Sequence, residues 1–135
     1  MRFKSTGILT YNPKTHLRSS DNWLILQCDE EFCKYYAGLF RREYPWLPKL
    51  ARPVWGAHIS VIRGETIPNA HLWGRGKGSE IEFEWDPGVQ SNKEYYWLKI
   101  KCDVLLDIRE GYGLKREPRF GLHLTIGRTT DEQRK

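Results

Sequence analysis

Two stretches of the chain place apolar residues at alternate positions and end in the same dipeptide. They are WLILQCD at residues 23–29 and WLKIKCD at residues 97–103, which share Trp, Leu, Cys and Asp at matching positions. Residues two apart in a strand face the same side, so each stretch carries one apolar face. The pattern predicts strands over residues 22–28 and 95–102, and its repetition predicts a duplicated unit.

A helix is expected after each of these strands. Asp29 and Asp103 stand where an N-cap residue accepts hydrogen bonds from the first turn. Apolar residues then recur at helical spacing; they are Phe32, Tyr36, Leu39 and Phe40 in the first unit and Val104, Leu105, Ile108 and Tyr112 in the second. Pro45 and Pro48 are expected to end the first helix, and Gly113 the second.

Each predicted helix leads toward a strand that carries one short motif. WGAHISVIR, residues 55–63, contains Gly56-x-His58-x-Ser60, and FGLHLTIGR, residues 120–128, contains Gly121-x-His123-x-Thr125. In a strand, the His and the hydroxyl residue of each motif share a face, opposite an apolar face that suits helix packing. Each unit is therefore predicted to run strand, helix, strand.

The repeats account for most of the chain. The first covers about residues 22–63 and the second about residues 95–128, and further strands are predicted over residues 7–11 and 80–85. We therefore expect a single α+β domain over residues 1–128, built as two lobes related by a pseudo-twofold axis. Residues 129–135 form a polar tail.

Composition narrows the class of protein. The chain has 135 residues, 39% of them hydrophobic, which is enough for a folded core. The net charge of +5 suits an anionic partner such as RNA or a nucleotide. We expect no signal peptide, no membrane span and a cytoplasmic location, with the three cysteines as free thiols. No cluster of residues has convincing metal-ligand spacing, so we expect no metal and no cofactor.

The motif side chains suit phosphodiester chemistry. If the two lobes meet, His58, Ser60, His123 and Thr125 line one cleft. A neutral imidazole can take a proton from the attacking group, while a protonated one gives a proton to the leaving oxygen. The hydroxyls can donate hydrogen bonds to the non-bridging phosphate oxygens, where negative charge develops.

GAHISVIRG and GLHLTIGR resemble the paired H-x-T/S motifs of the 2H phosphoesterase superfamily, which includes LigT-like RNA phosphodiesterases and viral phosphodiesterases. The resemblance implies a bilobal fold with antiparallel sheets, helices on the outer faces and a shared central cleft. It also implies that the four motif residues are catalytic. Ser60 stands where Thr is more usual, which keeps the hydroxyl. The compact chain is more similar to the viral anti-CBASS nucleases, which cleave cyclic oligonucleotide immune signals.

Six other residues are candidates for substrate binding. They are Tyr11, Trp73, Arg75, Lys77, Lys99 and Lys101. Residues 71–79, HLWGRGKGS, lack the spacing of a phosphate-binding P-loop and are expected to form a basic loop over the cleft, although a plain surface loop fits the pattern equally well. Arg63 and Arg128 each follow a motif His by five residues. This odd offset predicts that they point away from the cleft, unless the strand ends or twists first.

The leading prediction is a metal-independent phosphodiesterase acting on cyclic nucleotides. The alternative enzyme is a 2′,3′-cyclic phosphodiesterase acting on RNA ends. The alternative from another class is a non-catalytic module that binds RNA or nucleotides, which would not need two imidazoles in register. No membrane or protein partner is expected.

Overall fold

The computed structural model describes residues 2–15, 20–45, 50–53, 55–92 and 94–128. Pro48 and the tail at 129–135 lie outside these residues. The elements in chain order are β1 (Phe3–Tyr11), β2 (Trp23–Gln27), α1 (Glu31–Glu43), β3 (His58–Arg63), the short 3-10 helix η1 (Ala70–Leu72), β4 (Glu80–Trp85), β5 (Gln90–Ser91), β6 (Tyr95–Lys101), α2 (Asp103–Gly111) and β7 (His123–Arg128).

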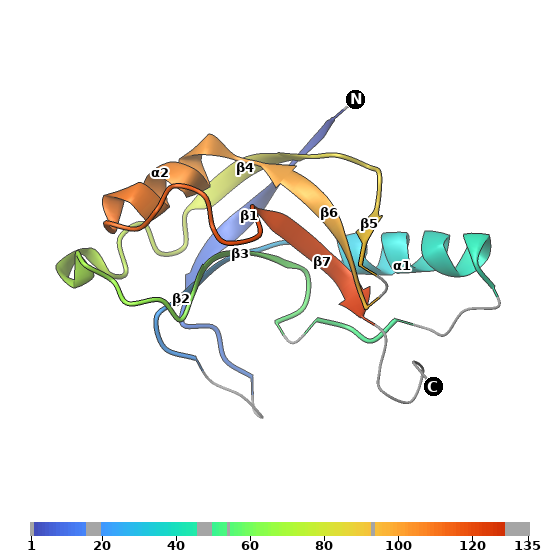
Figure 1. Cartoon of the computed structure of the whole chain (residues 1–135), viewed down its shortest axis with the longest axis horizontal. Helices are drawn as coiled ribbons and strands as arrows, with labels where there is room; N and C mark the ends of the chain where they lie inside the picture. The colour runs from blue at the N-terminus through green and yellow to red at the C-terminus, as the bar shows by residue number, and fades with distance from the viewer. Residues whose placement is uncertain (1, 16–19, 46–49, 54, 93, 129–135) are drawn as a thin grey trace.

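The strands form one antiparallel sheet that closes on itself (Figure 1). The strand order is β4-β1-β2-β3-β7-β6-β5. β4 also pairs with β6, with Glu84 opposite Lys101 and Trp85 opposite Ile100. Six strands therefore complete a barrel, with β5 attached outside it to β6. The predicted α+β class with antiparallel strands is confirmed. This single closed barrel does not show the two-lobed arrangement that the resemblance implies.

Strand boundaries follow the predicted pattern with three differences. β4 covers the predicted residues, whereas β1 begins at Phe3, before the predicted residue 7. β3 and β7 begin at their histidines because Gly56 and Gly121 adopt positive φ values of 73° and 69°, which strand residues do not. The two-residue strand β5 and the helix η1 were not predicted, since neither is long enough to show a periodic pattern.

The helix starts differ in the residue that caps them. Glu30 occupies the N-cap of α1 without a side-chain cap, so the prediction of Asp29 as the cap is one residue too early, although the Asp29 carboxylate accepts a hydrogen bond of 2.9 Å from the backbone N–H of Glu31. Asp103, predicted at the matching cap position, is instead the first residue of α2, and Cys102 occupies the cap. The backbone of Cys102 is extended, so the strand conformation continues to this residue. Its buried thiol donates to the Glu82 carbonyl at 3.4 Å.

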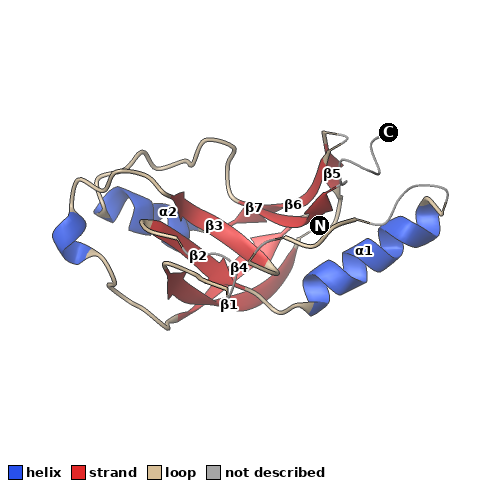
Figure 2. Ribbon diagram, turned by 90° about the horizontal axis from the view of Figure 1, so that it is seen from below, coloured by secondary structure: helices blue, strands red, loops and turns tan. Residues whose placement is uncertain are grey.

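Each helix packs against the motif strand of the other repeat. α1 contacts β7, and α2 contacts β3 (Figure 2). The smaller core cluster lies on the α1 side and contains Tyr36, Leu50, Leu98 and Ile126. Because the packing crosses over, neither repeat can bury its apolar face without the other, and the molecule is one unit.

A buried arginine on α2 anchors that helix to β3. Arg109 is 2% exposed and donates hydrogen bonds to the Val61 carbonyl at 2.8 Å and the Lys115 carbonyl at 2.9 Å. It also makes two hydrogen bonds, of 2.7 and 3.1 Å, to the carboxylate of Glu65. A buried charge is tolerated when it is paired and fully hydrogen-bonded, as it is here.

We expect Arg109→Met to lower the free energy of unfolding by about 2–4 kcal/mol, because it leaves Glu65 unpaired and a buried carbonyl without a donor. Urea denaturation measures this change. The matched control is Arg116→Met, since Arg116 is also paired with carboxylates but lies at the surface. The control should lose much less stability. Equal losses in the two variants would contradict the anchoring role of Arg109.

Candidate functional site

The two motif strands lie side by side in the barrel. β3 and β7 pair antiparallel with Ile59 opposite Leu124. Continuing this register by one residue in each direction places His58 opposite Thr125 and Ser60 opposite His123. The two histidines therefore lie on one diagonal of a four-residue cluster and the two hydroxyls on the other. Diagonal neighbours on such a strand pair are roughly 7–8 Å apart, enough to hold a phosphate between the imidazoles.

The glycine of each motif orients the imidazole that follows it. The carbonyl oxygen of Gly56 lies 2.7 Å from Nδ1 of His58, and that of Gly121 lies 3.1 Å from Nδ1 of His123. A carbonyl only accepts hydrogen bonds, so each Nδ1 carries the hydrogen, and Nε2 of the neutral ring is left as a free base. Both glycines need positive φ for this contact, and a Cβ at residue 56 would also collide with the Glu30 carboxylate.

The four motif residues line one depression, which we call the motif cleft. It consists of three adjoining cavities of about 420, 620 and 390 Å³ that share lining residues. His58 lines the largest cavity, His123 lines the other two, and Ser60 and Thr125 each line two of the three. The structure thus brings together all four predicted catalytic residues.

Arg63 lines all three cavities of the motif cleft, contrary to the prediction from its odd offset. The reason is a bulge in β3: Leu24 pairs with Ile62 while Ile25 pairs with Ser60, so Val61 is an extra residue. An extra residue reverses the alternation of the positions that follow it. Val61 and Ile62 are accordingly both fully buried, and Arg63 returns to the face of His58 and Ser60.

β7 contains a bulge at the same place relative to its motif. Trp97 pairs with Thr125 and Tyr96 pairs with Gly127, so Ile126 is the extra residue, three positions after His123. Arg128 consequently lines the largest cavity of the motif cleft. The prediction that Arg128 points away from the cleft is therefore also wrong. The two repeats therefore share a bulge that the hydrophobic pattern of their sequences does not predict.

Both motif histidines are weaker bases than an ordinary histidine. Burial lowers the pKa of His58 and of His123 below the usual value for histidine, and the positive charge of Arg63 lowers both pKa values further. The charge of His123 also lowers the pKa of His58, whereas the hydrogen bonds to the glycine carbonyls oppose these effects. Both rings are therefore neutral at pH 7 when no ligand is bound.

The two motif hydroxyls are available to a ligand. Ser60 is 6% exposed and Thr125 is partly exposed, and both line the motif cleft. Within the described ranges, neither hydroxyl forms a hydrogen bond with another residue. Each can therefore donate to an anion placed between the histidines.

Aromatic side chains form walls on both sides of the motif cleft. Trp55 lines its largest cavity and Phe120 lines the other two. Phe120 is 68% exposed, and its ring faces the guanidinium of Arg119 at 5.1 Å. The lining also includes Trp23, Tyr95 and Trp97. None of these aromatic residues was predicted to bind substrate, although an aromatic residue directly precedes the glycine in both motif copies.

The two predicted lysines lie on β6, beside the motif cleft. Lys99 is exposed and stands opposite His123 in the pairing of β6 with β7. Lys101 stands opposite Glu84, where β4 closes the barrel. Lys99 can therefore contribute positive charge next to the cleft, while Lys101 lies roughly 7 Å further along the strand.

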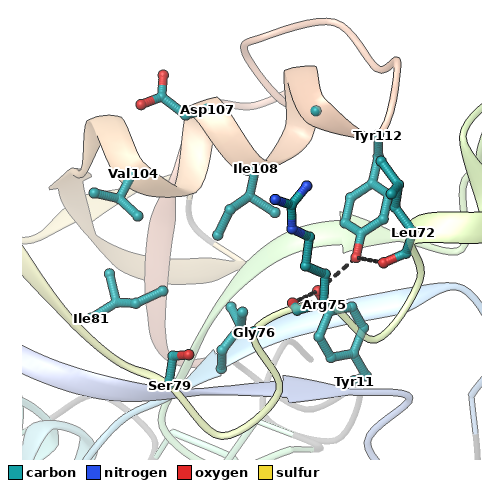
Figure 3. A pocket seen from close by; sticks show the side chains of 12 residues that line it. Tyr11, Leu72, Arg75, Gly76, Ser79, Ile81, Val104, Asp107, Ile108 and Tyr112 are labelled. Atoms are coloured by element: carbon teal, nitrogen blue, oxygen red, sulfur yellow. Dashed lines mark hydrogen bonds between the residues drawn. The ribbon is translucent and has the colours of Figure 1, made fainter.

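The other four predicted substrate residues lie elsewhere. Tyr11 and Arg75 line a separate cavity that has no lining residue in common with the motif cleft (Figure 3). The ring of Trp73 packs edge-on against Tyr11, with centroids 4.8 Å apart, and Lys77 is exposed. The loop does not reach the cleft because it is bonded back to β1, where the Leu9 carbonyl accepts from the Gly78 N–H at 2.9 Å.

In the part of the chain that the structure describes, no three His, Cys, Asp or Glu residues are placed to hold a metal ion. Cys28, Cys33 and Cys102 are all buried. None of the described helices is long and apolar enough to cross a membrane.

We expect an NMR titration to give pKa values below about 6.5 for both motif imidazoles, with Nδ1 protonated in the neutral rings. Arg63→Gln should raise both pKa values, because it removes a positive charge that opposes protonation. Arg75→Gln is the control, since it removes the same charge from the separate cavity, and it should leave both values unchanged. Equal responses to the two substitutions would rule out a direct effect of Arg63.

Comparison of the chain with protein-family models, with curated proteins and with solved structures finds no significant match. A function for the motif cleft must therefore be argued from its own residues and geometry.

Proposed function

We propose that the chain is a metal-independent phosphodiesterase that hydrolyses cyclic nucleotides, with His58 and His123 as general base and general acid. The observation that carries the proposal is the four-residue cluster on β3 and β7. Two imidazoles expose their basic nitrogens to one cleft, and two free hydroxyls lie on the crossing diagonal. Among the described residues, neither Nε2 atom has a hydrogen-bond partner, which a purely structural role for both histidines would not require.

The proposed reaction needs one proton on the histidine pair. The neutral imidazole takes a proton from a water molecule as its oxygen forms a bond to phosphorus. The protonated imidazole then gives its proton to the leaving ribose oxygen as the P–O bond breaks. The product is a phosphomonoester with a free hydroxyl, and the pair ends with the proton on the opposite ring. Exchange of this proton with solvent restores the starting state.

The electrostatics favour a single proton on the histidine pair. Burial lowers the pKa of both rings, and the positive charge of Arg63 lowers both further, while the glycine carbonyls oppose this effect. The charge of His123 also lowers the pKa of His58, whereas Glu30 raises it. Because two charged rings repel each other, one imidazole stays neutral and can act as the base while the other carries the proton and acts as the acid.

The surrounding groups can stabilise the transition state. Charge develops on the non-bridging phosphate oxygens, and the hydroxyls of Ser60 and Thr125 are positioned to donate to them. The guanidinium of Arg63 supplies a positive charge between the two motifs and can bind the phosphate in two-point fashion. Lys99 adds charge at the edge of the cleft.

The shape of the motif cleft supports a nucleotide as substrate. Aromatic walls on both sides of the cluster offer flat surfaces for bases on either side of one phosphodiester bond, and a stacked base typically contributes about 1–3 kcal/mol. A cyclic oligonucleotide has this arrangement, so we propose substrates of the kind that viral anti-CBASS nucleases cleave. The paired motifs, the matching bulges and the strand–helix–strand repeat support a relationship to the 2H phosphoesterases, including their pseudo-twofold symmetry.

We expect His58→Ala and His123→Ala each to lower kcat by about 10²–10⁴-fold, the usual contribution of a general acid or base. The assay is chromatographic separation of products from cyclic di- and trinucleotides and from 2′,3′-cyclic mononucleotides. His71→Ala is the matched control, because His71 lies exposed in η1 and lines none of the motif cavities. Its kcat should equal that of the wild type.

The same panel separates the alternatives. Turnover of 2′,3′-cyclic mononucleotides alone would assign the protein to RNA-end processing, and binding of nucleotides without turnover would show a binding module. Activity that disappears in EDTA and returns with a divalent cation would contradict the metal-free mechanism.

We expect kcat/KM to follow a bell-shaped pH profile with its maximum below pH 6.5. The reactive form has one neutral and one protonated histidine, so it is most abundant between two pKa values that are both lowered in the free protein. The rate should fall above the higher pKa, where the acid loses its proton. It should also fall below the lower pKa, where the base is protonated. A maximum at pH 8 would contradict this assignment.

A further inference from the structure

A second cavity, which we call the α2 cavity, lies between α2, the ends of β1 and β4, and the loop that follows η1 (Figure 3). Its volume is about 400 Å³, within the usual range for sites that bind small molecules. The lining surface is mostly apolar and includes the aliphatic side chains of Leu9, Leu72, Ile81, Val104 and Ile108. Neither the motif residues nor any other residue of the motif cleft contributes to it.

The tyrosine hydroxyls at this cavity are already engaged. Tyr11 donates to the Arg75 carbonyl at 2.5 Å, and Tyr112 donates to the Leu72 carbonyl at 2.9 Å. Burial and the neighbouring Tyr112 raise the pKa of Tyr11 far above its ordinary value, so this phenol stays neutral. The tyrosines therefore present apolar ring surfaces to the cavity. A nucleobase would find few partners for its own polar edges there.

Arg75 supplies an unmatched positive charge to the α2 cavity. Its side chain extends toward Ile108 and Tyr112 in Figure 3, and among the described residues its guanidinium has no hydrogen bond or ion pair. Among the described residues that line the cavity, the one other charged residue is Asp107, whose carboxylate is bound by Arg116 at 2.6 Å. A free guanidinium at the mouth of an apolar cavity is suited to a ligand that carries one negative charge on an apolar body.

We propose that the α2 cavity is a binding site for a small amphipathic organic anion, whose apolar body lies under α2 and whose carboxylate, sulfonate or phosphate group pairs with Arg75. The site is independent of the motif cleft and of its proposed reaction. The loop around residues 74–78 forms one wall, so a ligand would hold this loop against β1.

The proposal can be tested with two dyes that share one skeleton. 8-Anilinonaphthalene-1-sulfonate carries a sulfonate, whereas N-phenyl-1-naphthylamine lacks it. We expect fluorescence titration to show one site per chain for each dye. Arg75→Gln should weaken binding of the sulfonate about five- to tenfold and leave the neutral dye unchanged. Lys77→Gln, with the same charge change two residues away outside the cavity, should alter neither.

A second pair of variants locates the site. Val104 is half exposed at the cavity, so Val104→Glu should fold. The added carboxylate should weaken binding of the sulfonate dye by charge repulsion. Val89→Glu makes the same change at an exposed position outside the cavity and should not. NMR should show methyl shifts at Val104 and Ile108 on binding, and His123→Ala should bind both dyes normally. Absence of binding, equal affinity in Arg75→Gln, or shifts confined to the motif cleft would each overturn the proposal.

Discussion

The direction of Arg63, and with it the charge at the motif cleft, depends on one buried guanidinium on α2. At the bulge in β3, Val61 has no paired residue on β2. Its carbonyl lies in the core, where Arg109 donates a hydrogen bond to it. Glu65 balances the charge of Arg109 and also accepts the backbone N–H of Arg63 at 3.3 Å. Without this donor, the extra residue would leave a buried carbonyl unpaired, which is costly in a low-dielectric interior. The bulge and the arginine that it redirects are therefore parts of one network.

The second repeat holds the same bulge by weaker contacts. The helix that packs on β7 places Cys33 beside it, and this thiol donates to the Thr125 carbonyl at 3.6 Å. Arg128 is exposed, and its backbone pairs with Ala51 instead of with a carboxylate. Each repeat thus brings one arginine to the cleft, but Arg63 lines all three cavities and lowers the pKa of both histidines, whereas Arg128 lines only the largest cavity.

The sequence predicts the parts of this structure that depend on local pattern. Alternation and helical spacing place the long elements, and the repeated Gly-x-His-x-Ser/Thr predicts four side chains on one face. Alternation fails at Val61 and Ile126, because a bulge is stabilised by groups distant in sequence, such as Arg109. Closure of the barrel between β4 and β6 and the docking of residues 72–79 on β1 also depend on contacts far apart in the chain. The loop was therefore predicted over the cleft, whereas it borders the α2 cavity.

In the proposed mechanism, the charge of the substrate creates the acid. The empty cleft disfavours imidazolium, because burial removes water and Arg63 adds a like charge. A phosphodiester bound between the histidines carries one negative charge, which offsets that of Arg63 and favours protonation of the ring nearest the leaving oxygen. The pKa of that ring should then rise on binding, while the other ring, repelled across the cleft by the newly charged one, stays neutral. The guanidinium that suppresses protonation in the free protein thus becomes a ligand for the phosphate, and the acid–base pair forms only when there is a bond to cleave.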